Sequence, residues 1–166
     1  MEQFNYTPVL TGDSLCLRAL QEHDREALFV VSSDPLLWEQ HPQKDRCQRP
    51  VFDSWFDQAL TKQALVIIDA QQDKVIGSSR YYEVDEVNSS VAIGYTFLAR
   101  DYWGGVTNQE LKRLMLAHAF QSFDMVWFHI AEINLRSRKA AEKIGAVLSH
   151  TGLREGIPYC WYQLDQ

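Results

Sequence analysis

The spacing of apolar residues changes repeatedly along this chain, and each change predicts a new secondary-structure element. Residues 14–19 alternate apolar and polar side chains, which is typical of a strand with one buried face. Residues 22–32 and 51–62 instead place apolar side chains on one helical stripe. The Asp34-Pro35 pair ends the first helix, because the residue before a proline disfavours helical backbone. We expect the polar segment 36–50 to be a loop.

Strand-like segments dominate the rest of the chain, with two helical segments between them. The predicted strands are residues 64–70, 75–84, 91–98, 126–133, 146–152 and 159–164, and the predicted helices are residues 107–123 and 137–144. The resulting order is β-α-α-β-β-β-α-β-α-β-β, which predicts a mixed sheet covered by helices. Because no repeat or glycine-serine linker interrupts this order, we expect residues 1–166 to form one domain.

Composition excludes several classes of protein. A chain with 46% hydrophobic and 23% charged residues is an ordinary globular one, and its net charge of −6 argues against a nucleic-acid partner. The same charge slightly favours a cationic partner such as an amine. Cys16, Cys47 and Cys160 are far apart, so we expect neither a disulfide framework nor a metal site. The N-terminus is unlike a signal peptide, and no apolar run is long enough for a membrane span, which predicts a cytoplasmic protein.

A glycine-containing turn between a strand and a helix carries the first chemical signal. It lies in YTFLARDYWGGVTNQELKRLM, residues 95–115, where Thr107 and Glu110 have the spacing of a capping box that would fix the helix start at Thr107. The amides of Gly104, Gly105 and Val106 would then lie at a helix N-terminus, where unpaired donors and a partial positive charge favour an anion such as a pyrophosphate. Taken alone, the fragment is better explained by a tight turn with a good cap.

The second signal is AEINLRSRKAAEKIGAV, residues 131–147, in which a predicted strand ends at Asn134 and a short basic helix carries Ser137. Taken alone, both residues are ordinary helix-capping groups. The helix also bears a basic cluster, which either neutralises a phosphate or simply forms the solvated helix face: Arg136, Arg138, Lys139 and Lys143.

Together, in this order and about 25 residues apart, the two motifs resemble those of the GNAT (GCN5-related) N-acetyltransferase superfamily, and the branch of ribosomal-protein N-terminal acetyltransferases in particular. The resemblance implies an α/β (α+β) fold with a mixed, mostly antiparallel twisted sheet of about six to seven strands and about four helices. It also implies a splay between strands 91–98 and 126–133, acetyl-CoA as cosubstrate, no metal, and an amine acceptor.

The resemblance further implies roles for individual residues. Pantetheine would pair with the backbone of Phe97 and Leu98 in the splay, and the pyrophosphate would bind the amides that follow. The implied cofactor-binding set is Phe97, Leu98, Trp103, Gly104, Gly105, Val106, Thr107, Asn108, Asn134 and Ser137. The implied catalytic groups are the Leu98 amide, which would hold the oxyanion, and Ser137, which would assist the leaving thiolate. The acceptor would lie against Trp38, His41 and Trp55.

The chain departs from the family pattern at the expected acid and base. The tyrosine that serves as general acid in many members falls at Ala141, and a common glutamate falls near Ala92. Without a strong base, an α-amine with a pKa of about 7.7–8.0 is a better acceptor than a lysine, which would need about 3 kcal/mol more help. We therefore favour a protein N-terminus, with a small amine (polyamine, amino acid or antibiotic) or a non-catalytic acyl-CoA sensor as alternatives.

Other polar residues have structural interpretations. We expect His118 and His129 to be packed core histidines and Cys160 to be structural. An acidic turn at Glu83, Asp85 and Glu86 either faces solvent or attracts a cationic acceptor. The protein is expected to be a monomer or a homodimer.

Overall fold

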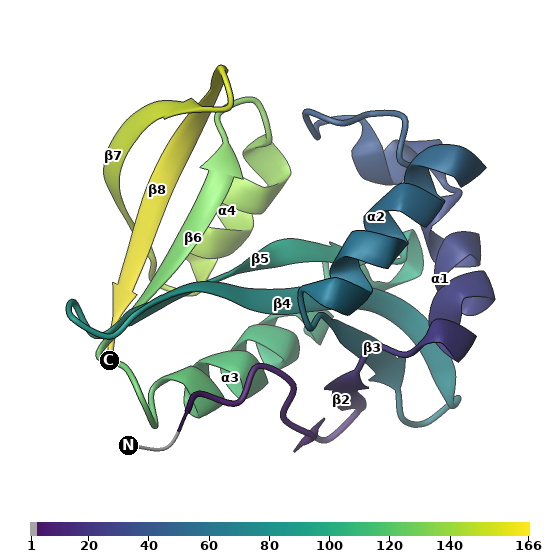
Figure 1. The fold of residues 1–166 in the computed structure, drawn as a ribbon, viewed down its shortest axis with the longest axis horizontal. Helices are drawn as coiled ribbons and strands as arrows, with labels where there is room; N and C mark the ends of the chain where they lie inside the picture. The colour runs from purple at the N-terminus through teal and green to yellow at the C-terminus, as the bar shows by residue number, and fades with distance from the viewer. Residues whose placement is uncertain (1–2) are drawn as a thin grey trace.

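The computed structural model describes residues 3–166, which fold around one eight-stranded sheet with the order β1-β2-β3-β4-β5-β6-β8-β7 (Figure 1). The strands are β1 (Leu10–Thr11), β2 (Leu15–Ala19), β3 (Leu65–Asp69), β4 (Lys74–Asp85), β5 (Ser90–Leu98), β6 (Met125–Ala131), β7 (Val147–Arg154) and β8 (Ile157–Asp165). The predicted mixed sheet is confirmed, with one strand more than expected. That strand, β1, is two residues long, which is too short to produce an alternating pattern.

Four α-helices flank the sheet: α1 (Arg25–Ser32), α2 (Arg49–Thr61), α3 (Thr107–Ala119) and α4 (Leu135–Lys143). The first is preceded by a 3-10 turn at Glu22–Asp24, so the predicted helix over 22–32 has two parts. The predicted loop over 36–50 contains most of a second 3-10 turn, Pro35–Trp38, and the first residues of α2, where Pro50 occupies the opening turn that tolerates it. Helix α3 ends at Ala119, four residues before the predicted position.

Strands β5 and β6 produce the predicted splay. They pair in parallel only from Ser90 opposite Met125 to Ala92 opposite Trp127. Beyond that point β5 stays with β4, whereas β6 pairs with β8 along its whole length. Figure 1 shows the result as two diverging halves of the sheet, with β4 and β5 in one and β6, β8 and β7 in the other.

A bulge bends β5 where the splay begins. Arg80 of β4 lies opposite Gly94, but Ser78 lies opposite Phe97, so Tyr95 and Thr96 together face one residue of β4. Tyr95 has a φ of 53°, a left-handed conformation that is costly for a residue with a side chain. A bulge re-aims side chains, and here it directs the Tyr95 ring outward, leaving it 43% exposed.

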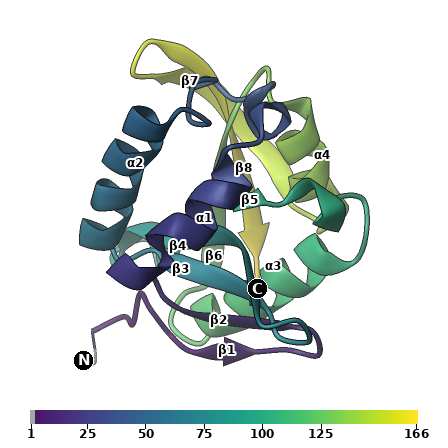
Figure 2. The same ribbon diagram turned by 90° about the vertical axis from the view of Figure 1, so that its right-hand side faces the viewer.

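Two apolar clusters hold the helices to opposite faces of the sheet. Leu111 and Met115 of α3 pack in the cluster that includes Ile76 and Ile93. Helices α1 and α2 cover the other face through a second, aromatic-rich cluster. Figure 2 shows α2 and α4 on opposite sides of the molecule, with β5, β6 and β8 between them. None of the helices within residues 3–166 is long and apolar enough to cross a membrane.

Candidate active site

A cleft of about 280 Å³ opens at the splay, and we call it the splay cleft. It collects residues from β5, β6, the turn before α3, and α4. Most of the residues singled out in the sequence line it: Trp38, His41, Phe97, Leu98, Trp103, Gly104, Asn108, Asn134 and Ser137. Gly105, Val106 and Thr107 follow Gly104 in the chain but lie outside the lining, and Trp55 lines a second pocket instead.

The N-terminus of α3 adjoins one end of the splay cleft, which Gly104 and Asn108 line. The first bond into the helix runs from the amide of Glu110 to the carbonyl of Val106, so the amides of Thr107 and Asn108 precede the ladder. Gly104 has a φ of 71°, which favours glycine, and a side chain added at Gly104 or Gly105 would meet only open space. The geometry suits an anion approaching the turn from solvent.

The predicted capping box does not form. The residue preceding α3 is Val106, and the side chain of Thr107 lies within the helix rather than capping it. Glu110 instead reaches across to the turn before β2, where its carboxylate accepts bonds from the Ser14 amide at 2.9 Å and the Ser14 hydroxyl at 2.5 Å. The helix begins at the predicted residue, but a tertiary tether and not a local cap holds its first turns.

Leu98 offers its amide to the splay. The neighbouring Ala99 amide bonds the carbonyl of Ile76 in β4, and strand alternation therefore turns the Leu98 amide away from β4. The Leu98 carbonyl already accepts the indole N–H of Trp103 at 3.0 Å. The Arg136 guanidinium stacks on that indole, 3.8 Å from a ring centroid, and so ties α4 to the turn before α3.

Asn134 and Ser137 meet at the start of α4. The Asn134 side chain caps the helix by accepting the Ser137 amide at 3.3 Å, and both residues also line the splay cleft. Two arginines of the basic cluster have different surroundings. Arg136 lines the cleft, whereas Arg138 bonds the Tyr162 hydroxyl and the Glu132 carbonyl.

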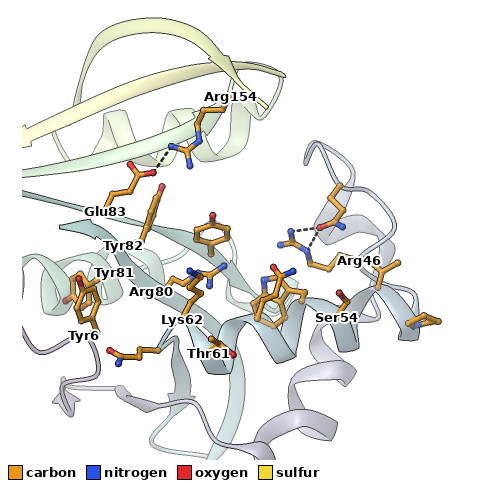
Figure 3. Close-up of a pocket in the computed structure, with 17 residues that line it drawn as sticks. Tyr6, Arg46, Ser54, Thr61, Lys62, Arg80, Tyr81, Tyr82, Glu83 and Arg154 are labelled. Carbon is orange, nitrogen blue, oxygen red and sulfur yellow. Dashed lines mark hydrogen bonds and ion pairs between the residues drawn. The ribbon is translucent and has the colours of Figure 1, made fainter. Parts of the chain in front are cut away.

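A second pocket of about 820 Å³ lies between α2 and the outer part of β4, and we call it the lateral pocket (Figure 3). Trp55 and Ser54 of α2 form part of one wall, and Tyr82 and Glu83 of β4 belong to the other. Arg46 and Tyr95 line both the lateral pocket and the splay cleft, so the two spaces meet at the β5 bulge.

A polar network around the buried His129 lies beside this junction. The Tyr82 hydroxyl and the Arg154 guanidinium each lie 2.9 Å from Nδ1 of His129, and Arg154 also pairs with Glu83 at 3.3 Å. Because arginine only donates, Nδ1 is an acceptor and the Tyr82 hydroxyl must donate to it. Burial lowers the pKa of His129 to about 4, with Arg154 adding to the effect of burial and Glu83 opposing it, so the ring is neutral at pH 7.

This network was missed in the sequence, where His129 is expected to be a plain core residue and Glu83 part of a solvated turn. His129 is buried, with a side chain 5% exposed, but its partners come from β4 and the β7–β8 hairpin. A side chain added at Gly94 would lie 3.1 Å from the Tyr82 oxygen, so glycine is what lets that hydroxyl reach the bulge. His118 is half-buried, with its ring tilted against Phe4 and Nε2 bonded to the Asn5 carbonyl, so it packs at the edge of the core.

Lys112 is a second residue that the sequence did not single out. It lines the splay cleft one helical turn after Asn108, and its ammonium donates to the Thr96 hydroxyl at 3.1 Å. Burial lowers the pKa of Lys112 to about 8. The only sequence signal is its i+4 spacing from Asn108, on the face that points at the strand.

The two tryptophans predicted to contact the acceptor are mostly buried in the core. Trp38 is 2% exposed, with its indole bonded to the Ser32 carbonyl and its ring against Phe97. Trp55 is 6% exposed and also packs on Phe97. Burial lowers the pKa of His41 to about 4, and its Nδ1 accepts the Gln43 amide, so no lone pair of its ring is left to act as a base.

Comparison with solved structures yields many similar folds. A GCN5-related N-acetyltransferase from Brucella melitensis has a TM-score of 0.87 and 18% identity, over 98% of this chain and 80% of that one. Spermidine N-acetyltransferase from Vibrio cholerae, in complex with CoA and spermine, has a TM-score of 0.67 and 17% identity, over 93% and 97%. A Vibrio cholerae protein proposed to be a ribosomal-protein-serine acetyltransferase has a TM-score of 0.74 and 14% identity, over 96% and 99%.

At these identities the likenesses establish a shared fold. No curated protein matches the sequence. Residues 14–147, most of the chain, match the family model described as acetyltransferase (GNAT) domain, and that stretch contains both motifs and the splay between β5 and β6. The chain is therefore a member of the GNAT acetyltransferase family.

Proposed function

We propose that this protein transfers the acetyl group of acetyl-CoA to the α-amine of an acceptor that enters through the lateral pocket. The observation that supports this proposal is that the splay cleft and the lateral pocket meet at the β5 bulge, where Arg46 and Tyr95 line both. A thioester laid along the splay cleft would end beside that junction, and an amine in the lateral pocket would approach it from the other side. In a GNAT neighbour, CoA and an amine bind together.

The expected reaction is direct attack on the thioester. The amine nitrogen forms a bond to the carbonyl carbon, the carbon–sulfur bond breaks, and the nitrogen loses a proton while the thiolate gains one. The Leu98 amide would hold the developing oxyanion, since it faces the splay and has no strand partner on that side. Ser137 would donate a hydrogen bond to the leaving sulfur, and the amides from Gly104 to Asn108 would bind the pyrophosphate.

The Tyr82–His129 pair supports an acceptor that arrives already neutral. While the Tyr82 hydroxyl donates to His129, its oxygen can accept an N–H from an amine at the bulge. The lowered pKa of His129 makes it a weak base, far from the value near neutrality that suits proton abstraction. An α-amine, with a pKa of about 7.7–8.0, supplies a useful neutral fraction at pH 7, whereas a lysine does not.

We further propose a protein or peptide N-terminus as the acceptor, as in the ribosomal-protein branch. The lateral pocket, at about 820 Å³, has room for more than a reacting amine, which supports an acceptor of several residues. A cytoplasmic setting, a monomeric or homodimeric state and the absence of a metal remain predictions.

The test is calorimetric titration with acetyl-CoA followed, in the same sample, by thiol release with a panel of peptides and small amines. We expect micromolar binding and release that requires both cosubstrate and acceptor. Binding with no release for any amine would instead support an acyl-CoA sensor. Absence of acetyl-CoA binding would refute the proposal at its first step.

A further inference from the structure

Two arginines of the lateral pocket are buried without an acidic partner. Arg46 is 7% exposed and Arg80 is 5% exposed, and neither forms an ion pair among residues 3–166. Arg46 donates only to the side-chain oxygen of Gln43, through Nε and Nη2. Arg80 has a buried Nε with no hydrogen-bond partner in the described chain, and its guanidinium lies 3.6 Å from the ring centroid of Tyr95.

Such an arrangement is unfavourable for the protein alone. Arginine is rarely buried unless it is paired, because removing its charge from water costs free energy that only a counter-charge and hydrogen bonds recover. Burial lowers the pKa of Arg46 to about 10, and repulsion from Arg80 adds to the shift. Burial also lowers the pKa of Arg80. Both guanidinium groups nevertheless stay protonated at pH 7, so the pocket carries two unneutralised charges.

The rest of the pocket does not neutralise them. Its other charged residues are Lys62, Arg154 and Glu83, which makes four cationic side chains and one carboxylate. That carboxylate is already engaged, since Glu83 pairs with Arg154 at 3.3 Å. Figure 3 shows Arg46 and Arg80 pointing into the same open space from α2's side and from β4, with the Arg154–Glu83 pair across the pocket.

We infer that Arg46 and Arg80 form a binding site for a carboxylate that the acceptor carries close to its reacting amine. This inference rests on the proposed acetyl transfer and specifies the acceptor class. A guanidinium presents parallel N–H donors that match the two oxygens of a carboxylate, and Arg80 still has an unpaired Nε to offer. Because Arg46 lines both spaces, the carboxylate would be held next to the β5 bulge, where the amine must lie.

The site has a consequence for charge selection. Two fixed positive charges disfavour an ammonium group beside them, so they promote the neutral form of a nearby amine and repel a polycation. The polyamine that occupies a GNAT neighbour is therefore a poor acceptor here. The net charge of −6 suggests a cationic partner, but the local field of the lateral pocket has the opposite sign.

Matched acceptors test the inference without altering the protein. Free glutamate, glutamine, glutamate α-amide and glutamine amide vary the two carboxylates of a small amine. Tripeptide amides Glu-Ala-Ala, Gln-Ala-Ala, Ala-Glu-Ala and Ala-Gln-Ala do the same beside a peptide N-terminus. We expect kcat/KM at least about tenfold higher for the acceptor whose carboxylate reaches the arginines than for the matched acceptor in which that one carboxylate is an amide, because that amide leaves the guanidinium groups without a counter-charge. A preference within the first set identifies a free amino acid as the acceptor, and a preference within the second set identifies a peptide.

Variants supply the second arm. Arg46→Gln and Arg80→Gln should both abolish the acid-over-amide preference. Arg80 lines the lateral pocket and not the splay cleft, so Arg80→Gln should also leave the Kd for acetyl-CoA within about twofold. Arg113→Gln, at a residue that is 62% exposed on α3, serves as the control and should keep the preference. A readout that needs no turnover uses succinate as the probe, which should raise the melting temperature of the unaltered protein and not that of Arg80→Gln.

The outcomes separate the two proposals. Turnover of acidic and amide acceptors at equal kcat/KM, or a preference that survives both arginine variants, would overturn the carboxylate site and leave acetyl transfer intact. Stabilisation by succinate that depends on Arg80, without thiol release from any acceptor, would support the site and contradict the transferase. Spermine as the best acceptor would overturn the inference outright.

Discussion

The tether between Glu110 and Ser14 is a stabilising contact. The sequence predicts Thr107 as the partner of Glu110 instead, in a capping box. Glu110 is 8% exposed, and its carboxylate accepts both the amide and the hydroxyl of Ser14. Hydrogen bonds to a charged acceptor contribute roughly 1.5–3 kcal/mol each, and the two share one carboxylate, so we expect Glu110→Ala to cost about 3 kcal/mol. Thr107→Ala should change stability by less than about 0.5 kcal/mol, because Thr107 makes no capping bond.

Urea unfolding followed by circular dichroism distinguishes these effects. With a slope of about 2 kcal/mol per molar urea, Glu110→Ala should lower the midpoint by about 1.5 M, and Thr107→Ala should leave it nearly unchanged. A capping box would instead cost about 1 kcal/mol at Thr107. Loss of similar stability in the two variants would refute the tether. A double-mutant cycle with Ser14→Ala should give a coupling free energy of about 1 kcal/mol or more.

The contribution of Glu110 also depends on pH in a defined direction. Desolvation raises the pKa of Glu110, but bonds from the Ser14 side chain and backbone outweigh it and hold the pKa below its ordinary value of 4.5. A carboxyl whose pKa is lowered on folding stabilises the protein fully above its unfolded pKa, and the effect is lost as pH falls through the folded one. The stability difference between the unaltered protein and Glu110→Ala should therefore be constant near pH 7 and shrink as the pH falls below 4.5.

Two further predictions concern turnover. Ser137→Ala should lower kcat more than it weakens acetyl-CoA binding, because we propose that its hydroxyl donates to the leaving sulfur. Steady-state kinetics measures kcat and calorimetry measures the binding. Unchanged kcat would remove Ser137 from the mechanism. Tyr82→Phe keeps the ring that packs on Tyr95 but deletes the hydroxyl bonded to His129. We therefore expect kcat/KM for the amine to fall by about 10- to 100-fold while the Kd for acetyl-CoA stays unchanged. Equal kcat/KM in the two proteins would show that the hydroxyl plays no part.

The two motifs that identify the family are local in sequence, and both lie where the sequence predicts. The strand-turn-helix at Gly104 and the Asn134 cap depend on residues within one turn of each other, and both lie at the cleft as expected. The capping box failed because Glu110 had two possible partners. Sequence spacing reveals only the near one, Thr107, whereas Ser14 is brought to Glu110 by the packing of α3 near the β1–β2 turn.

The sequence by itself predicted the order of the main strands and helices, because hydrophobic periodicity and helix termini are written in neighbouring residues. The splay between two strands and the proposed coenzyme site came from its resemblance to the GNAT family. The tertiary structure alone decided which side chains meet around the lateral pocket and the β5 bulge. Tyr82 meets His129 through the sheet, and Arg46 shares a pocket with Arg80. These partners are 47 and 34 positions apart in the chain, on separate elements, and no spacing rule links them. Burial then sets their chemistry, since an arginine that is harmless in water becomes an anion site only when the fold removes its solvent and supplies no acid.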